Sequence, residues 1–166
     1  LDITLVESDE IGIVGVGEAT IPPIRNLHAL LEITESRFFR ETGATFKLGI
    51  EFSNWGDLGE TYFHPFSAHG VDRWAAQFHH FWAKAHHLGE QLPLDEYSYE
   101  PLLARQGRFG QNGDRAANYA YHLDAGRYAL MLRHIAEANG VTRYEGKVAE
   151  VMLDPGSGHI RTVRLE

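Results

Sequence analysis

The sequence contains no cysteine, which excludes disulfide scaffolds, thiolate metal sites and cysteine nucleophiles. It has no surplus of basic residues, because 15 lysines and arginines stand against 23 aspartates and glutamates, for a formal net charge of -8. This balance argues against nucleic acid or an anionic membrane surface as a partner. The sequence also lacks any apolar run of about 18 residues that could span a bilayer. We therefore expect a cytoplasmic protein without nucleic-acid or membrane partners.

The residues that are present suit a folded domain. A chain of 166 residues, of which 43% are apolar and 11% aromatic, is long enough for about one domain with a sizeable core. Leu1 and Glu166 both fall in stretches that have the composition of strands. Because domains rarely begin or stop inside an element, we expect the chain to be an interior piece of a longer protein.

The N-terminal stretch predicts a strand, a glycine-rich segment whose backbone lies close to another group, and two helices. Residues 3–6 are apolar or β-branched, as in a buried parallel strand. Residues 12–17 contain glycine at every second or third position, which suits a backbone lying against another group. Thr20 can cap a helix whose apolar residues between 24 and 31 share one face, and a second helix is expected over 35–41.

The remaining pattern predicts an α/β protein with an inserted, aromatic-rich subregion. Residues 44–53 alternate between apolar and other side chains, as one half-buried strand does. Loop is expected over 54–70, an amphipathic helix over 74–85 and irregular structure over 89–118. Asp124 can cap a helix that runs to residue 139. Two strands are expected to follow it, over 141–153 with a break near 146 and over 159–165, joined by a turn at 155–158.

Lys47 is the strongest candidate for chemistry. It shares a strand face with Gly49, which has no side chain, and with Glu51. A lysine beside a bare glycine can reach across a cavity, and a partly desolvated ammonium has a lowered pKa. Such a group can donate a strong hydrogen bond or act as a nucleophile. The alternative is a Lys47–Glu51 ion pair on a solvated face.

Three other features each allow a functional and a structural explanation. Glu7 ends the first strand, where an acid binds ribose hydroxyls in dinucleotide-binding folds, but it can equally be an ordinary acid leaving a strand. The aromatic segment 62–66 can wall a pocket for a flat ligand or pin its own loop to the core. The histidines of residues 79–87 lack the i, i+4 pair with a nearby carboxylate, so we expect no metal there.

Several segments together resemble the flavin-dependent tryptophan halogenases. They read GVGEATIP at 15–22, ATFKLGIEF at 44–52 followed by NW, YFHPF at 62–66 and YAYHLD at 119–124. Their order and spacing match the family over nearly the whole chain. The resemblance implies a flavin-monooxygenase-type fold, with a Rossmann-like FAD domain and an added substrate region. Residues 1–20 would form a strand and the flavin strap, 21–118 the inserted region with the lysine strand and substrate loop, and 119–166 the return to the FAD domain.

The resemblance also implies roles for particular residues. Lys47 matches the family's essential lysine, which activates hypohalous acid. His64 and Phe66 match residues that line the indole pocket. The residues that would contact the flavin cofactor are Glu7, the strap residues Gly15, Gly17, Glu18, Ala19 and Thr20, and Val148 through its backbone.

The activity implied by the resemblance is halogenation of an electron-rich aromatic, tryptophan or a related indole. The family uses O2, a halide (chloride or bromide) and reduced FAD that a separate flavin reductase supplies, and a homodimer is compatible with it. Motifs that the family carries would precede Leu1 and follow Glu166, so we expect the 166-residue chain alone to be inactive. Two alternatives stay open: an FAD-dependent aromatic hydroxylase, which needs no Lys47, and a non-catalytic relative.

Overall fold

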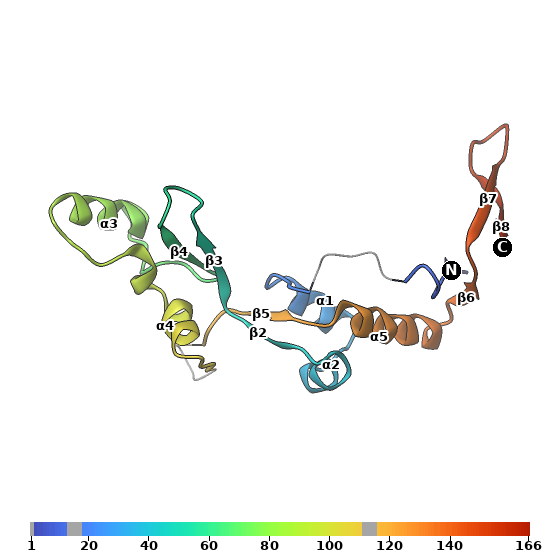
Figure 1. Cartoon of the computed structure of the whole chain (residues 1–166), viewed down its shortest axis with the longest axis horizontal. Helices are drawn as coiled ribbons and strands as arrows, with labels where there is room; N and C mark the ends of the chain where they lie inside the picture. The colour runs from blue at the N-terminus through green and yellow to red at the C-terminus, as the bar shows by residue number, and fades with distance from the viewer. Residues whose placement is uncertain (1, 13–17, 111–115) are drawn as a thin grey trace. The chain divides into compact units, whose positions relative to one another are not determined.

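The computed structural model describes residues 2–12, 18–110 and 116–166 (Figure 1). The chain divides into two compact units, the first made of residues up to 18, 40–43 and 123–166 and the second of 19–39 and 44–122. The strands of the described residues pair as four two-stranded sheets. In those same residues, none of the helices has the length and apolar character needed to cross a bilayer.

The first unit contains a parallel strand pair and a hairpin. Strand β1 (Thr4–Glu7) pairs in parallel with β6 (Thr142–Glu145), which follows helix α5 (Ala125–Ala138). Strands β7 (Val148–Leu153) and β8 (Ile160–Leu165) form an antiparallel hairpin (Figure 1). The first helical turn of α5 is stabilised by the predicted cap, because Asp124 Oδ1 accepts a hydrogen bond from the Arg127 N–H at 2.9 Å.

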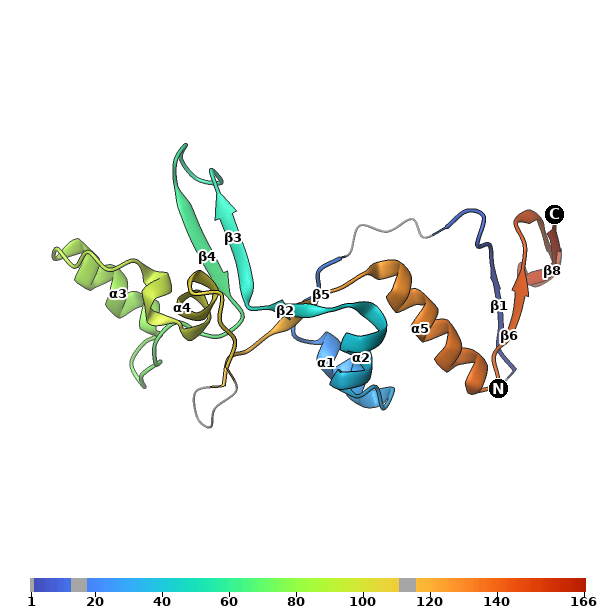
Figure 2. The ribbon, with the colours of Figure 1, turned by 60° about the horizontal axis from the view of Figure 1, so that its bottom comes forward.

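The centre of the second unit is a short antiparallel ribbon of β2 (Thr45–Lys47) and β5 (Ala120–His122). Helices α1 (Ile24–Leu30) and α2 (Glu35–Thr42) lie beside this ribbon (Figures 1 and 2). Phe38 is fully buried, with its ring centroid 4.8 Å from that of Tyr121. Phe39 lies 4.9 Å from Phe46, so rings from α2 pack against rings of both strands. This aromatic cluster is the core of the second unit.

The rest of the second unit is a hairpin and three short helices. Strands β3 (Gly49–Ser53) and β4 (Thr61–Pro65) pair antiparallel. Helix α3 (Phe78–His87) is followed by the 3-10 helix η1 (Leu94–Tyr97) and by α4 (Tyr99–Arg105). Glu100 in α4 is buried, and its carboxylate accepts hydrogen bonds from the Ser67 hydroxyl and, at 2.8 Å, from the Asn118 backbone N–H. These bonds join α4 to the segments after β4 and before β5.

The α/β class is confirmed, but three predicted elements differ from the structure. The strand predicted over 44–53 is two strands that are separated at Leu48. Before Leu48 the chain pairs with β5 as strand β2, and after it the chain pairs with β4 as strand β3. The loop predicted over 54–70 contains β4, and the irregular stretch 89–118 contains η1 and α4. In each case the deciding contacts are long-range pairings that the local pattern does not encode.

The helices also differ in detail from the prediction. Thr20 does not cap α1: the residue before the helix is Pro23, and the buried residue of the helix is His28 rather than its leucines. Helix α3 begins at Phe78, buries none of its residues and leaves Trp74 outside it, 99% exposed. The predicted first strand is parallel as expected but only partly buried, because in the described residues it pairs with β6 alone.

Candidate functional site

Lys47 ends β2, directly opposite Ala120 of β5. Its ammonium donates a hydrogen bond of 3.1 Å to the backbone carbonyl of Thr20. The same Nζ lies 5.5 Å from the centroid of the Phe66 ring, within the range of a cation–π contact. Burial lowers the pKa of Lys47, because the low-dielectric surroundings disfavour the charged ammonium. The side chain is therefore held in place and poised to act as a donor or as an amine.

Gly49 lets the chain turn closely past β4. A Cβ built on Gly49 would collide with the ring of Phe63 and with the carbonyl oxygen of His64. No side chain fits there without moving the β3–β4 hairpin. Glycine is thus required at position 49 by packing, because Phe63 and His64 already fill the room that a side chain would need.

Lys47 lines a cavity of about 480 Å³ in the second unit. The cavity walls combine aromatic rings and basic groups, the rings of Phe46, Phe63 and Phe109 and the cationic or titratable groups of Lys47, Arg108 and His122. Burial and the nearby Lys47 ammonium both lower the pKa of His122, so the imidazole is disfavoured from becoming a second cation there. An aromatic molecule can pack on these rings while the lysine faces it.

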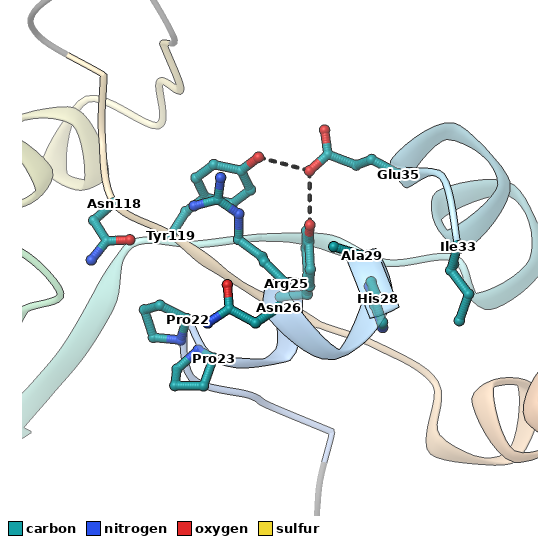
Figure 3. Close-up of a pocket in the computed structure, with 11 residues that line it drawn as sticks. Pro22, Pro23, Arg25, Asn26, His28, Ala29, Ile33, Glu35, Asn118 and Tyr119 are labelled. Atoms are coloured by element: carbon teal, nitrogen blue, oxygen red, sulfur yellow. Dashed lines mark hydrogen bonds between the residues drawn. The ribbon is translucent and has the colours of Figure 1, made fainter. Parts of the chain in front are cut away.

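A second cavity of about 670 Å³ lies on the helix side of the ribbon (Figure 3). Glu35 Oε1 accepts hydrogen bonds from the hydroxyls of Tyr119 and Tyr121, each at 2.8 Å. The Arg25 guanidinium lies over the Tyr119 ring, 4.0 Å from its centroid. Burial and the bond to Glu35 raise the pKa of both tyrosines, so the phenols stay protonated as donors. Glu35 and the two tyrosine hydroxyls of this cavity thus satisfy one another.

In the first unit, Glu7 lies at the carboxyl end of the parallel β1–β6 pair. Its Oε1 accepts from Arg143 Nε at 2.5 Å and lies 3.3 Å from Arg133 Nε. A cavity of about 430 Å³ opens beside Glu7, Gly12 and Arg133. Because both arginines bind one oxygen, the other oxygen can accept a ligand hydroxyl. A carboxylate in this place fits the ribose of a dinucleotide such as FAD.

The structure brings three of the predicted site residues together, Lys47, Thr20 and Phe66. His64 is exposed on β4 opposite Ile50, two residues before Phe66. Two residues that precede Thr20 are also held by backbone contacts. Ala19 forms a bridge with His122, and the Glu18 carbonyl accepts from the Leu123 N–H at 2.8 Å. Glu51, the alternative partner of Lys47, pairs with Phe63 in the β3–β4 hairpin.

Other predicted residues lie elsewhere. Glu7 and Val148 belong to the first unit, where Val148 begins β7 and is 51% exposed. Gly15 and Gly17 lie outside the described residues. Within the described part of the chain, no three His, Cys, Asp or Glu side chains gather as metal ligands would.

Sequence reasoning missed several residues that the fold brings to Lys47. His122 belongs to the segment YAYHLD, whose composition gives no sign that its imidazole faces the cavity. Arg108 and Phe109 come from the stretch predicted as irregular. The pairing of β2 with β5, about 75 residues apart in sequence, brings His122 to Lys47, and the stacking of Phe109 on Phe46 brings the segment after α4.

The comparisons with known proteins agree on one family. The family model described as tryptophan halogenase matches residues 1–166. The chain is 33% identical to the tryptophan 7-halogenase RebH of Lentzea aerocolonigenes, an alignment that covers 98% of this chain and 34% of that protein. Thus the chain spans about a third of the length of this curated relative.

Solved structures show the same likeness. One is Xcc4156, a flavin-dependent halogenase from Xanthomonas campestris, which is 50% identical to this chain with a TM-score of 0.91. The match spans 100% of this chain and 34% of the Xcc4156 chain. BrvH, a flavin-dependent halogenase from Brevundimonas sp. BAL3, is 38% identical with a TM-score of 0.86, over 99% of this chain and 34% of its own.

Proposed function

Because this chain belongs to the tryptophan halogenase family, we propose that the protein halogenates an electron-rich aromatic ring, tryptophan or a related indole. The reaction takes O2, chloride or bromide, and reduced FAD from a separate flavin reductase, in the cytoplasm. The likeness to flavin-dependent halogenases along the whole chain supports the reaction class. A lysine facing an aromatic-walled cavity supports the site.

Lys47 carries the halogen-transfer step in this proposal. Its ammonium can donate a hydrogen bond to the oxygen of hypohalous acid, which makes the halogen more electrophilic. Its neutral amine can instead attack the halogen, forming an N–halogen bond and releasing water, after which the ring takes the halogen and returns a proton. Both routes need a fixed Nζ in a partly desolvated place. The lowered pKa of Lys47 supports both, since it strengthens donation and increases the fraction of free amine.

The aromatic surroundings of Lys47 would hold the substrate ring. The Phe66 ring, whose centroid lies 5.5 Å from Nζ, is proposed to stack on the substrate ring, with His64 two residues away; both lie beside the lysine but outside the lining of its 480 Å³ cavity. A flat ring packed against Phe66 would present one edge to the lysine. Which ring carbon faces Nζ would then decide the position of the halogen.

The residues proposed to hold FAD come from the first unit and from the strap. Glu7 would accept the ribose hydroxyls, and Val148 would contribute its backbone. The strap would lie against the flavin with Gly15, Gly17, Glu18, Ala19 and Thr20. When bound, FAD supplies the two electrons with which O2 becomes the oxidant of the halide.

The test of this proposal is Lys47→Met in the full-length protein, since methionine keeps length and removes the donor. The variant is incubated with FAD, a flavin reductase, NADH, bromide and indole. We expect brominated product to fall by about 100-fold or more, because positioning and activation of the oxidant are both lost. Flavin binding and O2 consumption should continue.

Lys84→Met is the matched control, because Lys84 is exposed on α3. It should leave product formation unchanged. Bromination by Lys47→Met at nearly the unsubstituted rate would show that Lys47 is only a strand residue, and a hydroxylated product would favour the hydroxylase alternative. The 166-residue chain alone, which spans a third of its relatives' length, is expected to form no product.

A further inference from the structure

The segment 18–20 lies along β5 on the edge away from β2. Ala19 forms an antiparallel bridge with His122, which puts Thr20 directly opposite Tyr121. The Thr20 N–H donates to the Tyr121 carbonyl at 2.9 Å. In a regular antiparallel pair of this kind, the two residues exchange both backbone hydrogen bonds. The Tyr121 N–H should therefore bond to the Thr20 carbonyl.

The Tyr121 N–H bonds instead to the side chain of Thr20. It donates to Thr20 Oγ1 at 3.0 Å, and the same hydroxyl donates to the Tyr121 carbonyl at 3.0 Å. The hydroxyl thus occupies the place in the ladder that belongs to its own carbonyl. The Thr20 carbonyl is released from the ladder, and it is this oxygen that accepts the hydrogen bond from Lys47 Nζ at 3.1 Å.

The lysine side chain must cross β5 to make this bond. Lys47 stands on β2 and Thr20 on the far edge of β5, so two strand spacings of about 4.8 Å each separate their backbones. Ala120 lies directly opposite Lys47, on the same face of the ribbon. Its methyl group is fully buried, as expected if the lysine stem lies over it. A fixed acceptor beyond β5 therefore keeps the lysine extended in one direction.

We propose that the Thr20 hydroxyl is a positioning group for Lys47: by taking the ladder bond of Tyr121, it leaves the Thr20 carbonyl to orient the ammonium. The inference rests on the proposed role of Lys47 for its effect on halogenation. Its structural part stands apart from that role. Loss of the hydroxyl lets the Tyr121 N–H bond to the Thr20 carbonyl, so that Lys47 has to share this oxygen and is oriented by it less firmly.

The experiment compares Thr20→Val with Thr20→Ser in the full-length protein. The pH dependence with which Lys47 is acetylated by trace acetic anhydride is followed by peptide mass spectrometry, with Lys84 as internal reference. A hydrogen bond to the ammonium favours the charged form, so its loss should lower the labelling midpoint of Lys47 by about 0.5 to 1 pH unit in Thr20→Val. Thr20→Ser should keep the midpoint. His122 and Arg108, which share the cavity, are the same in every variant.

Halogenation of indole should fall about 10- to 100-fold in Thr20→Val and recover in Thr20→Ser, because a displaced lysine loses alignment with the oxidant. Thr20→Ala is the second hydroxyl-free variant if valine disturbs folding. An unchanged midpoint in both hydroxyl-free variants, or an equal fall in Thr20→Ser, would overturn the inference. A shifted midpoint with unchanged halogenation would keep the positioning role and instead refute the function proposed for Lys47.

Discussion

One face of the β2–β5 ribbon is covered by aromatic rings, whereas the other carries Lys47. On the covered face, Phe46 and Tyr121 stand opposite each other and pack against rings of α2. On the other face, Lys47 stands opposite Ala120, and its Nζ donates to the Thr20 carbonyl and lies near the Phe66 ring. Of two neighbouring residues in one three-residue strand, Phe46 thus packs against other rings, whereas Lys47 is the residue proposed to carry the chemistry.

This difference indicates how a short strand can hold a reactive group firmly. The period of two along a strand places Phe46 and Lys47 on opposite faces. Phe46 is half-buried and its ring packs against Phe39 and Phe109, which anchors β2 while Lys47 extends from the other face. Substitutions on the face with the aromatic rings should therefore mainly lower stability, whereas substitution of Lys47 should mainly lower activity.

The largest loss of stability should come from Phe38→Ala on the covered face. Phe38 is fully buried and its ring contacts those of His28, Phe39 and Tyr121. Removing a buried phenyl ring should lower the free energy of unfolding by about 3–5 kcal/mol. Denaturant unfolding of the full-length protein measures it. The control is Phe81→Ala, whose ring is 46% exposed, and an equal loss there would contradict the assignment of the core.

An intermediate effect is expected from Glu35→Gln, beneath the same face. Two phenols lose a charged acceptor at the protein surface, which should cost about 1 kcal/mol. The pKa of Tyr119 and Tyr121 should fall toward the ordinary value of 10.0. A titration of tyrosinate absorbance measures the change.

The sign of the accompanying pH effect follows from the raised pKa of the two tyrosines. The folded state holds their protons more tightly than the unfolded chain, so their contribution to stability is complete below the ordinary pKa and is lost as pH rises above it. Glu35→Gln should weaken this alkaline loss. Glu32→Gln, a surface change between α1 and α2, should leave it intact, and identical titrations for the two variants would refute the role of Glu35.

The smallest effect on stability should come from Lys47→Met, although its effect on halogenation should be the largest. A side chain outside the packed face should change the free energy of unfolding by no more than about 0.5 kcal/mol. Because the pKa of Lys47 is lowered, the folded state binds fewer protons than the unfolded chain just below pH 10.5, and stability rises with pH there. Lys47→Met should remove that rise. A destabilisation comparable to that of Phe38→Ala would erase the contrast between the faces.

The elements that the sequence predicted well are those with local signals. Asp124 and its helix were foreseen because a cap acts within one turn, and the β7–β8 hairpin because residues 155–158 have the composition of a turn. In the structure Asp154 Oδ1 accepts from the backbone N–H groups of Gly156 and Ser157 in that turn. Strand β4 was missed because residues 61–65 lack alternation and end in Pro65. Its partner β3 is what makes it a strand.

The site was predictable in its residue types but not in its contacts. The Lys47–Gly49 spacing predicted a lysine that could reach across a cavity beside a bare glycine, and the alternation of residues 44–52 predicted which residues share a face. It could not report that the chain changes partner at Leu48. Thr20 was interpreted as a helix cap because serine and threonine hydroxyls usually bond nearby backbone groups. Its actual partner, Tyr121, is 101 residues away.

The collision at Gly49 has a consequence for anyone who wishes to redirect the proposed halogenation to new substrates. A directed-evolution library around Lys47 would naturally randomise the neighbouring positions of β2 and β3. At position 49 nearly all such variants would disturb the β3–β4 hairpin, because any side chain collides with the Phe63 ring and the backbone carbonyl of His64. Diversity is better introduced at Arg108, which lines the same cavity, is exposed and can change in size and charge without moving a strand.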